Sequence, residues 1–232
     1  MAKTINVLCA GAVKSPVTAI AQGFEENTGN KVGLTFGPVG ALKAKLLAGE
    51  PADIVILSRP VLEQLVQEGK LLGQTISELG RVGVGITVRS STVLPDVSTP
   101  DALRRVLLAA KSIAYGDPAK GDSSGVHFAS VLKRLGIEHE VKERSVLAAA
   151  GLAVAELVKT GEVAIGATQA TVISACEGVL LAGLLPADLQ HITTYALALV
   201  ADEVSSDTAA AFAAYMNTSS AKAQLERAGL IQ

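Results

Sequence analysis

The chain has 232 residues, 49% of them hydrophobic, so it can bury a full core as one large domain or two lobes. A formal net charge of −2 leaves no basic surplus for binding phosphates, and 3% aromatic residues provide few surfaces for stacking bases. We therefore expect a globular protein that does not bind nucleic acid.

The cysteines and the N-terminal segment give no sign of a disulfide framework, a metal site or a secretory signal. Cys9 and Cys176 are too few for a disulfide framework and lack metal-ligand spacing, so we expect buried thiols, no metal and no cofactor. Residues 1–8 lead directly into a predicted strand rather than through a secretory signal. This predicts a cytoplasmic protein for the chain as given, or a periplasmic one if a leader has been removed from a mature chain. No apolar stretch reaches the roughly 18 residues of a membrane span.

Strands and helices alternate along the first third of the chain. Val17, Ile20, Ala21 and Phe24 recur at the spacing of one helix face, directly after a short apolar run. The same alternation occurs three times, with strands predicted over 5–10, 32–36 and 53–57 and helices over 17–28, 41–48 and 60–67. Three consecutive βα units predict a parallel sheet covered by helices.

A second set of elements follows a longer predicted strand at 81–89. Thr99 and Pro100 supply an N-cap and a first-turn proline for a helix to residue 110. The remaining prediction comprises strands at 112–115, 140–143, 163–167 and 192–200, and helices at 123–135, 148–159, 207–216 and 220–227. If the long strands at 81–89 and 192–200 cross between lobes, lobe 1 holds residues 1–84 plus 197–232 and lobe 2 holds 85–196.

Three junctions between a strand and the next helix are short and rich in small or hydroxyl residues. Ligands of open α/β sheets bind beyond the carboxyl ends of the strands, where helix N-termini attract anions. Ser15, Ser123 and Ser124 could donate hydroxyl hydrogen bonds there, although such turns are also often small for steric reasons. The junctions cover residues 9–16, 36–41 and 116–125, and none carries a nucleotide-binding fingerprint.

Four segments resemble the molybdate-binding group of periplasmic solute-binding proteins, in order along nearly the whole chain. They are INVLCAGAVKSPVTAIAQGFEENTG, VGLTFGPVGALKAKLLAGEPADIVIL, SIAYGDPAKGDSSGVHFASVLKRLG and VKTGEVAIGATQ. The resemblance implies a type II binding-protein fold of the α/β class. In that fold two lobes, each a mostly parallel sheet flanked by helices, are joined by two crossover strands and close on a small anion.

The loops depart from the molybdate-binding pattern at three places. Ala12 stands where the resemblance implies a serine, the run Pro38-Val39-Gly40 replaces a serine run, and Gln169 stands where a tyrosine is implied. A tetrahedral oxyanion would lose about 1–3 kcal/mol for each hydrogen bond left unmade. Lysines at 14, 43 and 120 remain beside the loops, so a di- or tricarboxylate suits them better. The predicted ligand-binding residues are Ala12, Lys14, Ser15, Val39, Gly40, Ser123, Ser124, Thr168 and Gln169.

One branch that resembles this family is enzymatic: aconitate isomerase moves a proton across an allylic tricarboxylate. Such a reaction needs an acid or base beside the carbon, and His127 is the candidate, although it could equally pack between helix and sheet. Glu143 and Asp122 are weaker candidates for the base. Three functions therefore stay open: a solute-binding protein that serves an ABC transporter if it is exported, an isomerase, and a cytoplasmic anion sensor.

Overall fold

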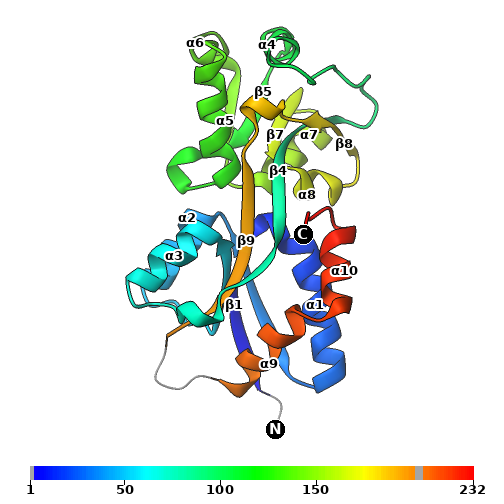
Figure 1. The fold of residues 1–232 in the computed structure, drawn as a ribbon. Coiled ribbons are helices and arrows are strands. Elements are labelled where there is room, and N and C mark those ends of the chain that lie inside the picture. Colours follow the sequence, from blue (N-terminus) through cyan, green and yellow to red (C-terminus); the bar gives the residue numbers. More distant parts are fainter. Residues whose placement is uncertain (1–2, 202–205) are drawn as a thin grey trace. The chain divides into compact units, whose positions relative to one another are not determined.

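The computed structural model describes residues 3–201 and 206–232, which form two compact units. The first unit comprises Met1–Arg81 and Thr193–Gln232, and the second comprises Val82–Ile192. The chain passes between them within strand β4 (Ser77–Arg89) and at the start of strand β9 (Ile192–Leu199) (Figure 1). The predicted boundaries, after residue 84 and before residue 197, fall within these same two strands.

The sheet of the first unit has the strand order β2-β1-β3-β9. Its parallel strands are β1 (Thr4–Ala10), β2 (Lys31–Gly37) and β3 (Ile54–Ser58). β1 pairs in parallel with both β2 and β3, whereas β9 is antiparallel to β3. The three predicted βα units are thereby confirmed, since their strands meet in one parallel sheet.

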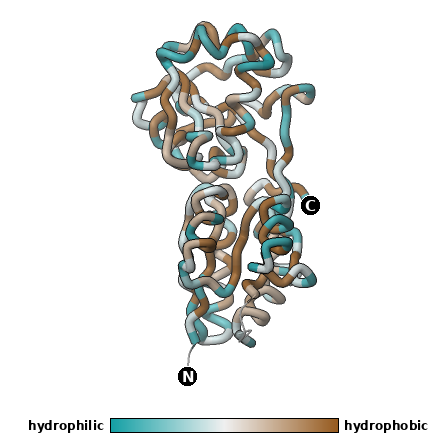
Figure 2. The backbone as a smooth tube through the Cα atoms, turned by 90° about the vertical axis from the view of Figure 1, so that its left-hand side faces the viewer, coloured by the Kyte–Doolittle hydropathy of each residue, from teal (hydrophilic) through white to brown (hydrophobic). Residues whose placement is uncertain are grey.

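Helices cover both faces of this first sheet: α2 and α3 lie on one side, and α1, α9 and α10 lie on the other (Figure 1). Their bounds are α1 (Lys14–Thr28), α2 (Val39–Leu47), α3 (Arg59–Gln67), α9 (Asp207–Met216) and α10 (Ser219–Arg227), with short 3₁₀ turns η1 (Gly11–Val13) and η2 (Gly73–Thr75). Phe24 packs edge-on against Phe212 and Tyr215, with ring centroids 5.1 and 5.5 Å away. The tube is hydrophobic along the central strands and hydrophilic at many outer turns (Figure 2).

The sheet of the second unit has the order β4-β7-β5-β6, and β8 pairs with β4. Its remaining elements are β5 (Ile113–Gly116), β6 (Ser145–Ala148), β7 (Ile165–Gln169), β8 (Val179–Leu184), α4 (Pro100–Ala109), α5 (Ser123–Arg134), α6 (Glu138–Val141), α7 (Gly151–Thr160), α8 (Ala170–Ser174), η3 (Pro118–Lys120), η4 (Lys142–Arg144) and η5 (Ala187–Leu189). β6, β5 and β7 are parallel, and β4 is antiparallel to β7 and β8. Ile113 packs with Phe128 of α5, whereas Ala114 packs with Val154 of α7, so these helices cover opposite faces.

The structure corrects the prediction between residues 138 and 151. The segment predicted as a strand at 140–143 forms α6 and η4, and the strand is β6. Ala148, predicted to begin a helix, instead ends β6 by pairing with Gly116 of β5, and α7 begins at Gly151. β8 was not predicted at all. No helix in the described ranges combines the length and apolarity that a membrane crossing requires.

Candidate functional site

The junction between β1 and α1 leaves the helix N-terminus without a side-chain cap. β1 ends at Ala10, a 3₁₀ turn follows, and Val13 occupies the N-cap position, where its side chain cannot accept a hydrogen bond. Ala12 is half-buried, and Lys14 and Ser15 are exposed. The Lys14 N–H donates to the Gly11 carbonyl, so the 3₁₀ turn continues into α1, and the positive end of the helix dipole lies at this turn.

The junction between β2 and α2 repeats this arrangement beside the first. Pro38 is the N-cap of α2 and makes no capping bond, and the helix begins with buried Val39 and half-buried Gly40. Ala10 and Gly37 are register partners in the parallel β1–β2 pair, so the two junctions leave the same sheet edge side by side. The structure therefore brings together the predicted residues of the first two loops.

Lysines near these two junctions have different surroundings. The Nζ atom of Lys14 lies 5.3 Å from the ring centroid of Phe36, near the end of β2, so its charge stays close to both junctions. Lys43 instead pairs with Glu68 of the segment after α3 at 3.0 Å and donates to Gln64 at 3.3 Å. Of these two predicted cations, Lys14 remains exposed for a ligand and Lys43 is engaged within the fold.

The junction between β5 and α5 in the second unit is closed by its own carboxylate. Oδ1 of Asp122, the N-cap of α5, accepts hydrogen bonds from the Gly125 N–H at 2.8 Å and the Ser124 hydroxyl at 2.6 Å. Ser124 is buried, Ser123 is half-buried, and a Cβ at Gly125 would overlap the carbonyl oxygen of Gly116. The predicted donor Ser124 thus has an internal acceptor, and a carboxylate already occupies this helix N-terminus.

Thr168 and Gln169, the last two residues of β7, are both buried. The hydroxyl of Thr168 has no hydrogen-bond partner among the described residues, and a Cβ at Gly151 would overlap it. An unpaired buried hydroxyl costs about 1–3 kcal/mol, so its presence needs an explanation. It lies directly beneath the first residue of α7.

The N-terminus of α7 is a feature that reasoning from the sequence missed. Its N-cap, Ala150, offers no side-chain acceptor, and the preceding Ala148 carbonyl accepts a hydrogen bond from the Asp117 N–H at 2.8 Å. This bond sets the β6–α7 junction beside the β5–α5 loop. The available signal was a run of three alanines and a glycine ahead of an apolar helix, which also fits the helix interior that was predicted.

His127, the predicted acid or base, is half-buried on α5 and hydrogen-bonded to the segment before β9. Its Nε2 atom lies 2.7 Å from the Leu189 carbonyl oxygen, and its ring contacts that of His191. Burial lowers the pKa of His127, and the charges of His191 and Arg134 lower it further against the opposing effect of the Leu189 bond. Because a carbonyl only accepts, Nε2 holds a proton, which leaves Nδ1 as the atom that could exchange one.

The described helices of eight or more residues fall into two groups, those with a side-chain cap at the N-terminus and those without one. Side chains of the N-cap residues Thr99, Asp122, Ser206 and Thr218 cap α4, α5, α9 and α10. No side chain caps α1, α2, α3 or α7, whose N-cap residues are Val13, Pro38, Ser58 and Ala150. The uncapped N-termini all follow strands that are parallel members of their own sheet, which is where an α/β protein binds ligands.

Comparison with known proteins agrees with this architecture. The family model of bacterial extracellular solute-binding proteins matches residues 5–231. Aconitate isomerase from a Pseudomonas species is 30% identical over 236 residues, covering 98% of this chain and 87% of that protein. A molybdate-binding protein of Azotobacter vinelandii is 27% identical over 166 residues, covering 71% of this chain and 64% of that protein.

The fold is shared with a solved structure of this kind. The periplasmic molybdate-binding protein of Azotobacter vinelandii superposes with a TM-score of 0.84 at 19% identity, covering 98% of this chain and 99% of that one. The type II binding-protein fold predicted from the sequence is therefore confirmed. The chain belongs to the family of bacterial extracellular solute-binding proteins and is similar to both a molybdate-binding protein and aconitate isomerase.

Proposed function

We propose that this protein binds a small di- or tricarboxylate anion at uncapped helix N-termini. The observation that carries the proposal is the absence of side-chain caps on α1, α2 and α7, whose N-cap residues are Val13, Pro38 and Ala150. First-turn N–H groups and the positive end of the helix dipole stabilise a carboxylate in such a position. Both units present such N-termini.

A carboxylate fits these N-termini better than molybdate does. Ala12, Val39 and Gln169 provide no hydroxyl, and the hydroxyl of Ser124 is already donated to Asp122. A tetrahedral oxyanion bound here would leave acceptors unpaired at about 1–3 kcal/mol each. Each carboxylate group has two oxygens to satisfy where molybdate has four, and Lys14 supplies a counter-charge at α1.

Binding of a carboxylate would give the protein a role in transport. Solute-binding proteins of this family bind small anions and typically work with ABC transporters, so a periplasmic form of this chain would deliver its carboxylate to such a transporter. The ABC transporter as a partner and the periplasm as the location both belong to this proposal.

A second function, isomerisation of an aconitate-like acid, is favoured by the 30% identity to aconitate isomerase over 98% of the chain. The reaction removes a proton from one carbon of an allylic system and returns a proton to another, so it is balanced without an oxidant. His127, with Nε2 held by Leu189, would use Nδ1 for the transfer, and N–H donors would stabilise the enolate-like charge. A cytoplasmic enzyme would suit this function.

A ligand panel tests the carboxylate proposal. Purified protein is heated with citrate, cis-aconitate, trans-aconitate, tricarballylate, molybdate or sulfate, and the hits are titrated by calorimetry. We expect at least one tri- or dicarboxylate to raise the melting temperature and to bind saturably. Stabilisation by molybdate or sulfate alone would contradict the proposal.

A separate assay tests isomerisation. Protein is incubated with cis- or trans-aconitate in D₂O, and proton NMR follows the interconversion and the uptake of deuterium. The isomerase proposal predicts both signals for wild type and a loss of at least tenfold in rate for His127→Gln. Tight binding without interconversion would refute catalysis and leave the carboxylate proposal standing.

A further inference from the structure

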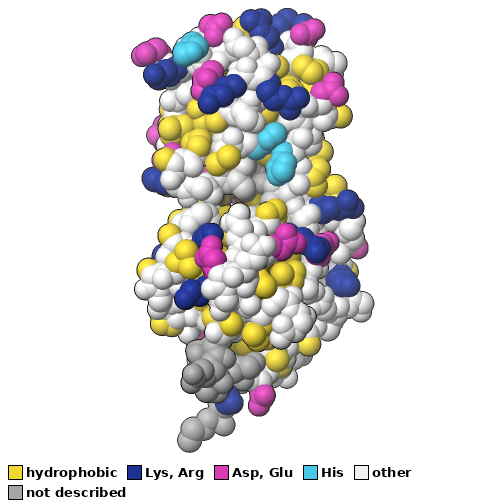
Figure 3. All heavy atoms as spheres, turned by 60° about the vertical axis from the view of Figure 1, so that its left-hand side comes forward, with side chains coloured by type: hydrophobic (Ala, Val, Ile, Leu, Met, Phe, Trp, Pro, Cys, Tyr) yellow, Lys and Arg dark blue, Asp and Glu magenta, His cyan; other side chains and the backbone are white. Residues whose placement is uncertain are grey.

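Two histidines lie in ring contact on the surface of the second unit. His127 belongs to α5, and His191 lies between η5 and β9. Their ring centroids are 5.2 Å apart, with an angle of 36° between the planes. His191 is exposed and His127 half-buried, and Figure 3 shows a pair of adjoining histidine side chains on the molecular surface.

Hydrogen bonds fix the backbone that carries His191. The side-chain oxygen of Gln190 accepts from the His191 N–H at 2.9 Å and from the Val84 N–H at 3.0 Å. The side-chain nitrogen of Gln190 donates to the Val84 carbonyl at 2.9 Å. The segment before β9 is therefore fastened to β4, and the position of His191 relative to α5 is set in advance.

The Leu189 carbonyl fixes the tautomer of His127. Since it accepts from Nε2 at 2.7 Å, the neutral ring carries its lone pair on Nδ1. Metal-binding histidines almost always donate their second ring nitrogen to a carbonyl or carboxylate in this way.

We propose that His127 and His191 together bind one transition-metal ion of the Zn²⁺ or Ni²⁺ class through one imidazole nitrogen each. Two imidazoles on one tetrahedral ion, with metal–nitrogen bonds of about 2.0–2.1 Å, have ring centroids roughly 5 Å apart. The observed separation of 5.2 Å matches that geometry. The inference is independent of anion binding at the helix N-termini, but it excludes the isomerase role of His127, which would use the same Nδ1 atom.

The surroundings limit the strength of this site. No group of three or more histidine, cysteine, aspartate or glutamate residues that could hold a metal occurs in the described part of the chain, so water or an external ligand completes the coordination. The guanidinium of Arg134, which donates to the Asp188 carbonyl at 2.6 Å, adds a positive charge near His127. We therefore expect weak, exchangeable binding that strengthens severalfold in Arg134→Gln.

Calorimetric titration of ZnCl₂ and NiCl₂ into protein without a polyhistidine tag tests the proposal, with MgCl₂ as the contrasting ion. We expect one transition-metal ion per chain and no binding of Mg²⁺, because magnesium prefers oxygen ligands. His191→Asn and His127→Asn should each weaken binding at least tenfold. His139→Asn, at an exposed histidine on α6, is the matched control and should bind like wild type.

The exposed position of His191 keeps the test decisive even if His127→Asn unfolds, since His191→Asn removes no side-chain hydrogen bond that the structure shows. Saturable binding that is lost in His191→Asn and kept in His139→Asn supports the site. Absence of saturable binding by wild type, or equal binding by His191→Asn, overturns it.

Discussion

The hydroxyl of Thr168 lies against Gly151, the first residue of α7, so closely that an added Cβ would overlap it. The hydroxyl is fully buried and has no hydrogen-bond partner among the described residues. This contact lets the β6–α7 junction approach the end of β7. It also makes the identity of residue 151 a sensitive test of the α7 N-terminus.

Gly151→Ala should destabilise the protein, by about 1–3 kcal/mol, because the new methyl group overpacks against Thr168. Helix propensity alone predicts the opposite, since alanine is favoured over glycine in a helix by roughly 1 kcal/mol. Urea unfolding measures the difference. Thr168→Ala in the same chain should restore stability, because the next atom of that side chain, Cβ, lies 3.6 Å from the added carbon. A stable Gly151→Ala would show that the contact is looser than described.

Thr168→Val should leave the free energy of unfolding unchanged or raise it. The substitution replaces an unpartnered buried hydroxyl with a methyl group of similar shape, which removes a desolvation penalty of about 1–3 kcal/mol. Thermal unfolding of the variant beside wild type measures the change. A clear loss of stability would mean that the Thr168 hydroxyl has a partner in solution.

Ser124→Ala should lower stability by about 1 kcal/mol and leave carboxylate affinity unchanged. Its buried hydroxyl donates to Asp122 at 2.6 Å, so removal weakens the cap of α5 rather than a ligand contact. Chemical unfolding and ligand titration of the same variant separate the two effects. Ser130→Ala, which removes an exposed hydroxyl bonded to a carbonyl of the same helix at 2.6 Å, serves as control. A tenfold loss of affinity in Ser124→Ala alone would return Ser124 to the ligand site.

Most of the fold could be predicted because hydrophobic periodicity determines it locally. Phe24 and its helical neighbours face the core as their spacing indicates, and β1 and β3 are short, mostly buried runs between clear turns. The error at residue 148, predicted to begin a helix, has a tertiary cause. Ala148 is a strong helix former by propensity, but pairing with Gly116 in a parallel register holds it in β6.

The candidate site was less predictable because hydrogen bonds within the protein decide which polar groups remain free to bind a ligand. Ser123 and Ser124 look like ligand donors in the sequence, yet the aspartate directly before them is an N-cap that accepts the second hydroxyl. The sequence does predict this, because an aspartate directly before a helix is a common N-cap. The buried hydroxyl of Thr168 was not predictable, because its surroundings come from α7, which sequence periodicity does not place.

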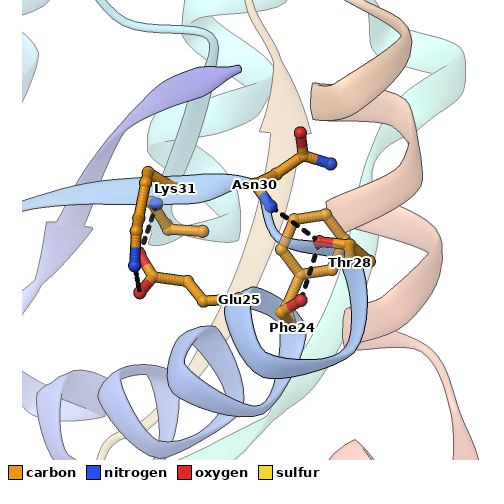
Figure 4. Close-up of polar contacts among 6 residues, drawn as sticks. Phe24, Glu25, Thr28, Asn30 and Lys31 are labelled. Atoms are coloured by element: carbon orange, nitrogen blue, oxygen red, sulfur yellow. Dashed lines mark hydrogen bonds and ion pairs between the residues drawn. The ribbon is translucent and has the colours of Figure 1, made fainter. Parts of the chain in front are cut away.

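The carboxylate of Glu25 should make stability depend on pH in the acidic range. It accepts from the Val32 N–H at 2.8 Å and pairs with Lys31 at 3.0 Å, at the end of α1 (Figure 4). The Val32 N–H bond, followed by Lys31, lowers the pKa of Glu25 in the folded protein. The unfolded chain therefore binds this proton more readily, and the stabilisation, complete above roughly pH 4.3, is lost as the pH falls through the folded value.

Glu25→Gln should accordingly be less stable than wild type at pH 7, and the difference should be smaller at about pH 4, below the unfolded pKa. Urea unfolding at both pH values measures this. Glu50→Gln provides the control, since the Glu50 carboxylate pairs with exposed Lys45 at 3.1 Å on the surface. A difference between Glu25→Gln and wild type that does not change with pH would assign the effect to packing instead of charge.

The central claim, that backbone N–H groups at uncapped helix N-termini hold a carboxylate, is tested most directly at Val39. Pro38 is extended at the N-cap and Val39 is the first residue of α2, a position that accepts proline. Val39→Pro and Val39→Ala both remove the branched, buried valine side chain, but only proline removes the N–H. Calorimetric titration with the carboxylate that binds wild type most tightly should show Val39→Pro binding at least tenfold more weakly than Val39→Ala. Equal affinities of the two variants would contradict the account.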